Sequence, residues 1–300
     1  MHTIHTIDLK FQKVEKTIAS FLIQGKGKPV LIETGPHSTW NQLKSSLQHL
    51  GFKPKDLAAV LLTHIHFDHA GAAWEFAKAG VKVYLHPKGI THLSNPIKLW
   101  NSAAKIYGDE KMDTLWGPME SIDPNFLVSV DDMEDVSIEG LTFTSIHSPG
   151  HASHHIAWQL GESVFTGDVG GVKIKNGPVV PPCPPPDIHI EAWKSSIEKI
   201  SDCHPKELYL THFGKISNPQ EHLSQLISVL DDWAIWIKRK FDQNELAEEI
   251  TPEFMNYTAK QLENKGAGKD LQKLYELANP SWMSVGGLLR YWKLKTEGRL

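Results

Sequence analysis

The chain has 300 residues, 40% of them hydrophobic, so it is long and apolar enough to bury a substantial core. Its 31 basic and 35 acidic residues give a formal net charge of −4, which disfavours a nucleic-acid partner, because proteins that bind polyanions usually carry a clearly basic domain. No segment approaches 18 unbroken apolar residues, so the sequence predicts neither a transmembrane helix nor a membrane partner.

The N-terminal residues and the cysteines predict a cytoplasmic location. Residues 1–16 lack a basic stretch followed by an apolar one, which is the pattern of a secretory signal. Cys183 and Cys203 are too few for a disulfide framework, so we expect a reducing compartment. Histidine, in contrast, is abundant at 17 residues, and its placement carries most of the functional information.

The first two hundred residues alternate short β-type runs with helical stretches, which is typical of an α/β layered domain. Residues 17–23 and 29–34 are expected to form strands joined by a hairpin turn, and a helix is expected to follow and to end at Gly51. A second helix is expected at residues 72–80. Further strands are expected at residues 57–64, 81–87, 126–130, 141–147, 154–160, 163–167 and 207–212.

Two segments interrupt this alternation. Residues 88–125 form a helical insert that carries Trp100, Tyr107 and Trp116, and these aromatic side chains are expected either to line a substrate pocket or to pack in the core. Residues 177–187 contain so many prolines that they must form a stiff, extended loop. This loop is expected either to wall the site or to serve as an inert connector.

The strand signals stop at about Pro219, after which helical apolar spacing continues to the end of the sequence. We therefore expect two domains, an α/β domain over residues 1–218 and a helical C-terminal extension over residues 219–300. A homodimer is left open, because the terminal segment is mildly basic and fits a dimer contact or a solvated helix face better than a nucleic-acid surface.

The residues that carry chemistry begin with His64, His66, Asp68 and His69, which fall within six positions directly after a buried-strand candidate. In an extended segment His64 and His66 point to the same side, so two imidazoles can reach one ion. If a helix follows, Asp68 and His69 are aimed at a neighbouring position. The spacing therefore predicts two adjacent metal ions rather than one.

Three later strands also end in residues of the ligand type. The strand at 141–147 is followed by His151, the strand at 163–167 by Asp168, and the strand at 207–212 ends in His212. Strand ends that gather on one edge of a sheet are where α/β proteins place their sites. Five histidines and two aspartates suit zinc, iron or manganese, and the absence of cysteine from the set argues against a structural zinc site.

These motifs resemble those of the metallo-β-lactamase-fold hydrolase superfamily over roughly residues 15–215. The resemblance implies an αββα four-layer sandwich, here with a helical C-terminal extension. It also implies that His64, His66 and His151 bind one metal ion, that Asp68, His69 and His212 bind the second, and that Asp168 bridges them. Within this family the sequence is most similar to the glyoxalase II-like and lactonase-like branch.

The resemblance implies a dinuclear metal-dependent hydrolase with two divalent ions, zinc being expected before iron or manganese. A metal-bridging hydroxide would cleave an ester-type bond, a thioester or a lactone, of a small molecule, with Asp68 as the catalytic residue that orients the nucleophile and moves its proton. A phosphodiesterase and a mononuclear iron persulfide dioxygenase of the same fold are the alternatives.

The sequence also departs from the family pattern. Glu33 stands where the family usually has an aspartate, and its extra methylene is expected to change how the ligand histidines are oriented. The segment after Asp168 lacks the arginine-containing and cysteine-bearing pattern associated with glyoxalase II, which weakens that particular assignment. His154 and His155 are expected to be neighbours of the ligands or structural residues rather than ligands.

Overall fold

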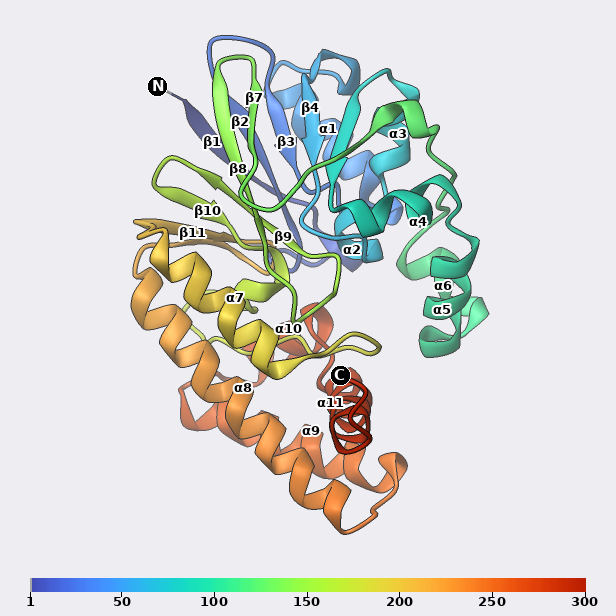
Figure 1. Ribbon diagram of the computed structural model, residues 1–300, viewed down its shortest axis with the longest axis vertical. Helices are drawn as coiled ribbons and strands as arrows, with labels where there is room; N and C mark the ends of the chain where they lie inside the picture. Colours follow the sequence, from blue (N-terminus) through green and yellow to red (C-terminus); the bar gives the residue numbers. More distant parts are fainter. Residues whose placement is uncertain (1) are drawn as a thin grey trace. The chain divides into compact units, whose positions relative to one another are not determined.

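The computed structural model describes residues 2–300 (Figure 1). These residues form two compact units. The first unit runs to His147 and includes His154–Phe165, and the second unit consists of Ser148–Ser153 and Thr166–Leu300. The division expected at residue 218 stays a prediction. Helix α8 does begin at Pro219, where the strand signals were expected to stop.

The first unit contains ten strands and six helices within the described residues. The strands are β1 (Thr3–Asp8), β2 (Ala19–Gln24), β3 (Val30–Ile32), β4 (Ala59–Leu61), β5 (Lys82–Leu85), β6 (Leu127–Ser129), β7 (Asp135–Ile138), β8 (Leu141–His147), β9 (Ile156–Leu160) and β10 (Ser163–Phe165). The helices are α1 (Trp40–His49), α2 (Phe67–Ala70), α3 (Ala73–Lys78), α4 (Ile90–Ser94), α5 (Ile97–Tyr107) and α6 (Asp109–Leu115).

Two sheets form the core of the first unit. One has the strand order β1-β2-β3-β4-β5-β6, antiparallel from β1 to β3 and parallel from β3 to β6, and the other contains the antiparallel run β10-β9-β8-β7. The sheets pack face to face, because the rings of Phe21 on β2 and Phe165 on β10 lie 5.3 Å apart. The indole of Trp158 on β9 donates a hydrogen bond of 2.9 Å to the carbonyl of Leu62.

Helices α1 and α3 lie side by side, since the rings of Trp40 and Phe76 meet edge to face at 5.2 Å. The apolar residues Leu43 and Leu47 of α1 and Phe76 of α3 are fully buried. Strands β3 and β4 are apolar and buried on both faces, as expected of parallel strands covered on both sides, whereas β5 alternates the buried Val83 and Leu85 with the more exposed Lys82 and Tyr84.

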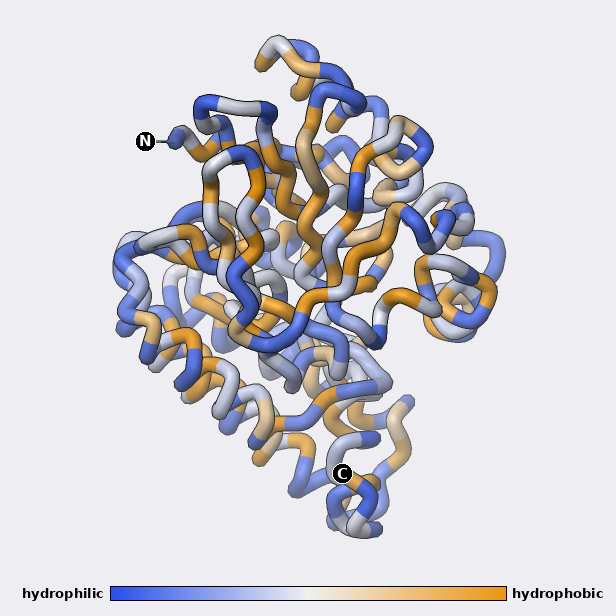
Figure 2. Tube along the Cα trace, turned by 45° about the horizontal axis from the view of Figure 1, so that its top comes forward, coloured by the Kyte–Doolittle hydropathy of each residue, from blue (hydrophilic) through white to orange (hydrophobic). Residues whose placement is uncertain are grey.

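The second unit is built from helices and one hairpin. Its elements are the helix α7 (Ile190–Asp202), the strands β11 (Glu207–Leu210) and β12 (Gly214–Ile216), and the helices α8 (Pro219–Asp242), α9 (Ala247–Asn264), α10 (Lys269–Ala278) and α11 (Ser281–Thr296). Hydrophobic and hydrophilic residues alternate along α8 in Figure 2. Its apolar side packs on α9 through Trp233 and Phe254, whose rings lie 5.2 Å apart, and the indole of Trp292 on α11 donates to the carbonyl of Ala234 on α8.

The expected α/β fold class, its main strands and the helical C-terminal extension are confirmed. The helical insert at 88–125 contains α4, α5 and α6, as the spacing predicted. The sequence did not predict β1, β7, β12 or α7. The strand expected at 57–64 is shorter than predicted, because β4 ends at Leu61 and leaves His64 in the loop that follows. No helix among residues 2–300 combines the length and apolarity that crossing a bilayer would need.

Candidate functional site

The first group of predicted ligands lies in the loop that joins β4 to α2. This loop is held to β9 from two sides, because the amide of Ile156 donates to the carbonyl of Thr63 at 2.7 Å and the Trp158 indole donates to the carbonyl of Leu62. His66 has extended backbone angles and directly precedes α2, so the chain changes from loop to helix between the second and third predicted ligands. The condition set for Asp68 and His69, that a helix follows His66, is therefore met by α2.

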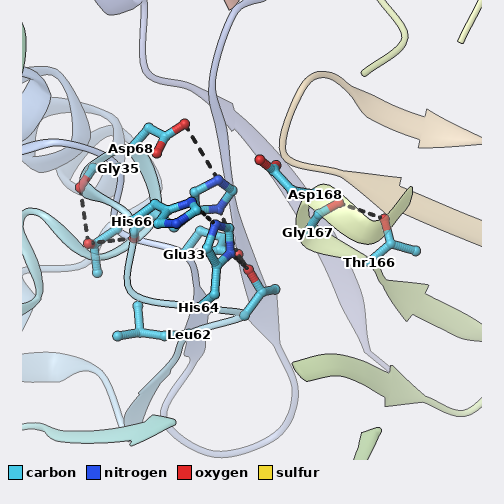
Figure 3. Close-up of polar contacts among 12 residues, drawn as sticks. Glu33, Gly35, Leu62, His64, His66, Asp68, Thr166, Gly167 and Asp168 are labelled. Atoms are coloured by element: carbon cyan, nitrogen blue, oxygen red, sulfur yellow. Dashed lines mark hydrogen bonds and ion pairs between the residues drawn. The ribbon is translucent and has the colours of Figure 1, made fainter. Parts of the chain in front are cut away.

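The four side chains form two pairs, and His64, His66 and Asp68 are labelled in Figure 3. His64 Nε2 lies 2.9 Å from His66 Nδ1, and His69 Nε2 lies 3.6 Å from Asp68 Oδ2. The rings of His64 and His69 are 3.9 Å apart, which brings the pairs together. His64 and His69 are buried, whereas His66 and Asp68 are half-buried. This pairing of His64 with His66 and of Asp68 with His69 agrees with the two-ion expectation.

Glu33 orients both buried histidines of this group. It lies at the end of β3, is fully buried and has a φ of 65°, which is uncommon for a residue other than glycine. Its Oε1 accepts a hydrogen bond from the Thr63 hydroxyl and lies 3.2 Å from His69 Nδ1. Glu33, whose longer side chain was expected to change the orientation of the ligand histidines, therefore contacts one of them, His69, directly.

Thr63 extends this contact to His64, whose Nδ1 lies 3.0 Å from the Thr63 hydroxyl oxygen. Because Thr63 gives its only hydroxyl proton to Glu33, its oxygen can only accept from His64. The proton of the neutral imidazole is therefore held on Nδ1, and the lone pair lies on Nε2, the nitrogen nearest to His66. Thr63 was not predicted as a functional residue, although it immediately precedes the motif.

The second group consists of His151, Asp168 and His212, all buried in the second unit. Asp168 Oδ2 lies 3.3 Å from His151 Nε2, and Asp168 Oδ1 lies 3.5 Å from His212 Nε2. Each carboxylate oxygen thus faces a different histidine. Asp168 belongs to the tight turn Gly167–Gly170, and Figure 3 shows Asp168 with the preceding residues Thr166 and Gly167. The Thr166 amide donates a hydrogen bond to the carbonyl of Tyr209 on β11.

Helix α7 fixes the segments that carry His151 and Asp168. Gly150 has a φ of 136°, and a Cβ at this position would lie 2.3 Å from the Cα of Trp193, so no other residue fits. The Trp193 indole donates to the carbonyl of Val169 at 2.9 Å, and the hydroxyl of Ser196 donates to the carbonyl of Pro149 at 2.7 Å. Helix α7 therefore holds Val169, next to Asp168, and Pro149, two positions before His151.

The chemistry of both groups fits divalent metal ions. Every predicted ligand atom is an imidazole nitrogen or a carboxylate oxygen, which zinc, iron and manganese accept. His151 also follows a pattern common among metal-binding histidines, since its Nδ1 hydrogen-bonds the carbonyl of Pro182 at 2.8 Å and leaves Nε2 to face Asp168. Among the described residues neither group includes Cys183 or Cys203, and burial raises the pKa of the Cys183 thiol, which keeps it protonated.

His154 and His155 lie beside the first group, as expected of neighbours. His155 is fully buried, with its ring 4.9 Å from that of His64, and the ring of His154 is 5.7 Å from that of His66. In the sequence, this position was indicated by the closeness of His154 and His155 to the predicted ligand His151.

The three aromatic residues predicted for a substrate pocket lie in one cluster with Phe67, the residue before Asp68. The ring of Phe67 is 5.8 Å from Trp100 and 6.1 Å from Trp116, and Tyr107 meets Trp116 edge to face at 5.1 Å. Trp116 is 7% exposed and therefore belongs mainly to the core, whereas Trp100 and Tyr107 are half-buried. Contact of these residues with a substrate stays a prediction.

Tyr107 is also electrostatically close to Asp68. Burial raises the pKa of the Tyr107 phenol, and the negative charge of Asp68 raises it further. The phenol is therefore a neutral hydrogen-bond donor over the whole physiological pH range. No sequence pattern indicated this relationship, because only the fold brings the two distant residues together.

This fold and these ligand groups define a metallohydrolase, and the comparison with protein families agrees. The family model of the metallo-beta-lactamase superfamily matches residues 15–212, so the chain belongs to that superfamily and is an enzyme of its hydrolase type. The predicted family is confirmed.

Individual relatives share 26% to 28% sequence identity with this chain. The chain is 28% identical over 240 residues to the metallo-beta-lactamase fold-containing protein ST1585 of Sulfurisphaera tokodaii, covering 76% of this chain and 84% of that protein. It is 26% identical over 220 residues to an N-acyl homoserine lactonase of Bacillus thuringiensis, covering 65% and 79%. It is 26% identical over 217 residues to the atrochrysone carboxyl ACP thioesterase of Aspergillus fumigatus, covering 69% and 54%.

Among solved structures, a metallo-beta-lactamase family protein of Thermus thermophilus, TTHA1429, matches with a TM-score of 0.67 and 19% identity. The match covers 99% of this chain and 94% of that chain, so it includes the C-terminal helices.

Proposed function

We propose that this protein is a dinuclear metal-dependent hydrolase that cleaves an ester-type bond, a thioester or a lactone, of a small molecule. His64, His66 and His151 would hold one ion, and Asp68, His69 and His212 the other, with Asp168 shared. The ligands favour zinc, and iron or manganese fit the same donor set. The proposal includes a cytoplasmic location and a small-molecule partner rather than nucleic acid or membrane.

The observation that carries the proposal is the position of the Asp168 carboxylate. Its two oxygens lie 3.3 and 3.5 Å from ligand nitrogens of two different histidines, His151 and His212. A carboxylate that served a single ion would leave one oxygen free to bond the protein around it. Two oxygens that each face a different ligand are instead what a bridging carboxylate requires.

Bound divalent ions supply a water of lowered pKa and polarise the substrate oxygen. The residues of the chain then have separate tasks. Glu33 and Thr63 keep the Nε2 lone pairs of the buried histidines available. Asp68, the more exposed acid, is placed to accept a proton at Oδ2 and to return it to the leaving group. The Tyr107 phenol, which stays protonated, can donate a hydrogen bond to an oxygen that gains negative charge.

Two observations support an ester-type substrate. The named relatives include an N-acyl homoserine lactonase and an atrochrysone carboxyl ACP thioesterase, and both names denote hydrolases of ester-type bonds. In this chain, the aromatic cluster of Phe67, Trp100 and Tyr107 adjoins Asp68 and offers an apolar surface of the kind that an acyl group contacts. The net charge of −4 gives no comparable support for a polyanionic substrate.

The test is elemental analysis of protein purified without added metal, together with hydrolysis of a thioester, a lactone and bis-nitrophenyl phosphate. We expect two ions per chain and turnover of the thioester or the lactone. A His64→Asn variant should lose metal and activity, whereas the matched variant His204→Asn, which changes an exposed histidine outside both groups, should keep both. Turnover of the phosphodiester alone would indicate a phosphodiesterase. One iron ion without hydrolysis would overturn the proposal and direct attention to oxygen uptake with persulfides.

A further inference from the structure

The central part of the proline-rich loop 177–187 is buried, whereas Pro184 and Pro185 are half-buried and Pro186 is exposed. Val179, Val180, Pro181, Pro182 and Cys183 are all buried in the second unit. Because every residue of 181–186 except Cys183 is a proline and lacks an amide hydrogen, the loop cannot be held by a ladder of backbone hydrogen bonds. Besides the bridge between Val172 and Val180 and the bond from the Gly177 amide to the Ile174 carbonyl, contacts with other parts of the second unit hold the main chain of the loop.

The loop contributes one contact to the predicted ligands. The carbonyl of Pro182 lies 2.8 Å from His151 Nδ1 and, as an acceptor, fixes the proton of the imidazole on that nitrogen. The lone pair is then on Nε2, which faces Asp168. A small displacement of Pro182 would therefore change both the tautomer of His151 and the direction of its ligand nitrogen.

Helices α10 and α11 hold the loop on both sides of Pro182. Tyr275 on α10 donates to the carbonyl of Pro178 at 2.5 Å and accepts from the amide of Ile174 at 3.1 Å. The side-chain amide of Asn279 donates to the carbonyl of Pro181, and the Ser284 hydroxyl on α11 accepts from the amide of Cys183, both at 3.4 Å. The two residues next to Pro182 in sequence are thus bonded to Asn279, which directly follows α10, and to Ser284 on α11.

Helix α11 approaches this part of the loop as closely as a glycine allows. A Cβ on Gly287 would lie 2.0 Å from the carbonyl oxygen of Cys183 and 2.9 Å from the carbonyl carbon of Pro184. The preceding residue, Gly286, has room for a side chain, because its Cβ would lie 3.8 Å from the Pro185 ring, an ordinary van der Waals contact. These adjacent glycines provide a disruptive substitution and a matched control in the same turn of one helix.

We infer that helices α10 and α11 position the metal-ligating nitrogen of His151 by holding the Pro182 carbonyl through the proline-rich loop. Tyr275, Asn279, Ser284 and Gly287 are then positioning residues, which act on the site without touching it. The consequence for metal binding rests on the proposed function, but the consequence for the His151 imidazole does not.

The experiment compares wild type, Gly287→Ala and Gly286→Ala as full-length chains. The first measurement is the tautomer of His151 in metal-free protein, from long-range ¹H–¹⁵N correlations of the imidazoles, with His151→Gln as the assignment variant. The second is zinc affinity by chelator competition. We expect wild type and Gly286→Ala to show the Nδ1–H tautomer and Gly287→Ala to show a mixture. We expect Gly287→Ala to bind one of its zinc ions about 10-fold to 100-fold more weakly.

A His151 tautomer that is the same in Gly287→Ala as in wild type would overturn the inference. If Gly287→Ala does not fold, the tautomer of His151 is measured in Tyr275→Phe instead. This variant removes the hydroxyl that bonds Pro178 without adding volume, and we expect it also to show a mixture of His151 tautomers. An unchanged tautomer in that variant would also overturn it. Wild type that binds no zinc would refute the proposed function instead, while the tautomer comparison would still test the positioning role.

Discussion

The Thr63 hydroxyl donates its proton to Glu33 and accepts a hydrogen bond from His64 Nδ1 at 3.0 Å. A single hydroxyl therefore connects the acid at the end of β3 to the first histidine of the motif. Glu33 itself lies 3.2 Å from His69 Nδ1. One buried carboxylate thus orients a predicted ligand of each ion, one directly and one through Thr63.

Replacement of Thr63 by valine keeps the shape of the side chain but removes this connection. We expect Thr63→Val to weaken zinc binding by about 10-fold to 100-fold, the usual cost of losing a partner that orients a ligand histidine. Thr63→Ser retains the hydroxyl and should stay close to wild type. Chelator competition with all three proteins measures the difference, and equal affinities for the valine and serine variants would refute the role of the hydroxyl.

Loss of the Asp168 carboxylate should affect both ions. Because each of its oxygens faces a different histidine, we expect Asp168→Ala to retain less than one ion per chain and to lose turnover together with the metal. The control is Asp202→Ala, which removes an exposed carboxylate at the end of α7. Metal analysis and kcat of both variants test this, and an Asp168→Ala protein with two ions and full turnover would exclude the bridging role.

The Tyr107 phenol should matter for the rate rather than for metal content. Tyr107→Phe keeps the ring against Trp116 but removes the hydroxyl that the charge of Asp68 influences. We expect kcat to fall by about 10-fold to 100-fold with two ions retained, because a donor to developing negative charge is lost. The Tyr84→Phe variant, changed on β5, serves as the control. An unchanged kcat would restrict Tyr107 to packing.

Stability should depend on the protonation of His222 on α8. Burial lowers the pKa of His222 to about 4 from its ordinary 6.5, although its hydrogen bond to the Gly170 carbonyl acts in the opposite direction. The unfolded chain then binds a proton more readily than the folded chain, so stability falls as the pH drops below about 6.5 and the fall levels off near pH 4.

From pH 7 to pH 5 the His222 contribution should amount to a loss of about 2 kcal/mol. His222→Gln retains a donor for Gly170 but does not titrate, so its free energy of unfolding should change less over the same range. Urea unfolding of metal-free wild type and variant at both pH values provides the measurement. Identical pH dependence in the two proteins would show that other groups determine it.

Local sequence patterns predicted the features that are encoded locally. The strand and helix periodicities located β2 to β6, β8 to β11 and the C-terminal helices, and the spacing from His64 to His69 predicted the two pairs that the structure shows. Strands β1, β7 and β12 were missed because each is short or mixes polar and apolar residues.

The contacts that orient the ligands could not be predicted. The partner of His151 is the main-chain carbonyl of Pro182, which has no residue-type signal, and the residues that hold that carbonyl lie about 100 positions further along the chain. Glu33 was noticeable as a departure from the family pattern, but its contact with Thr63 depends on the parallel pairing of β3 with β4. Such relationships require the folded chain.

Because Cys183 is buried, its reaction with an alkylating reagent reports how often the proline-rich loop separates from α11. Its thiol is enclosed beneath α11, and a raised pKa leaves almost no thiolate for an alkylating reagent to attack, whereas Cys203 is partly exposed. Modification of Cys183 in the native protein therefore requires the loop to separate from the helix. The alkylation rate of Cys183 relative to Cys203 measures how often that separation occurs, without any mutation and without metal.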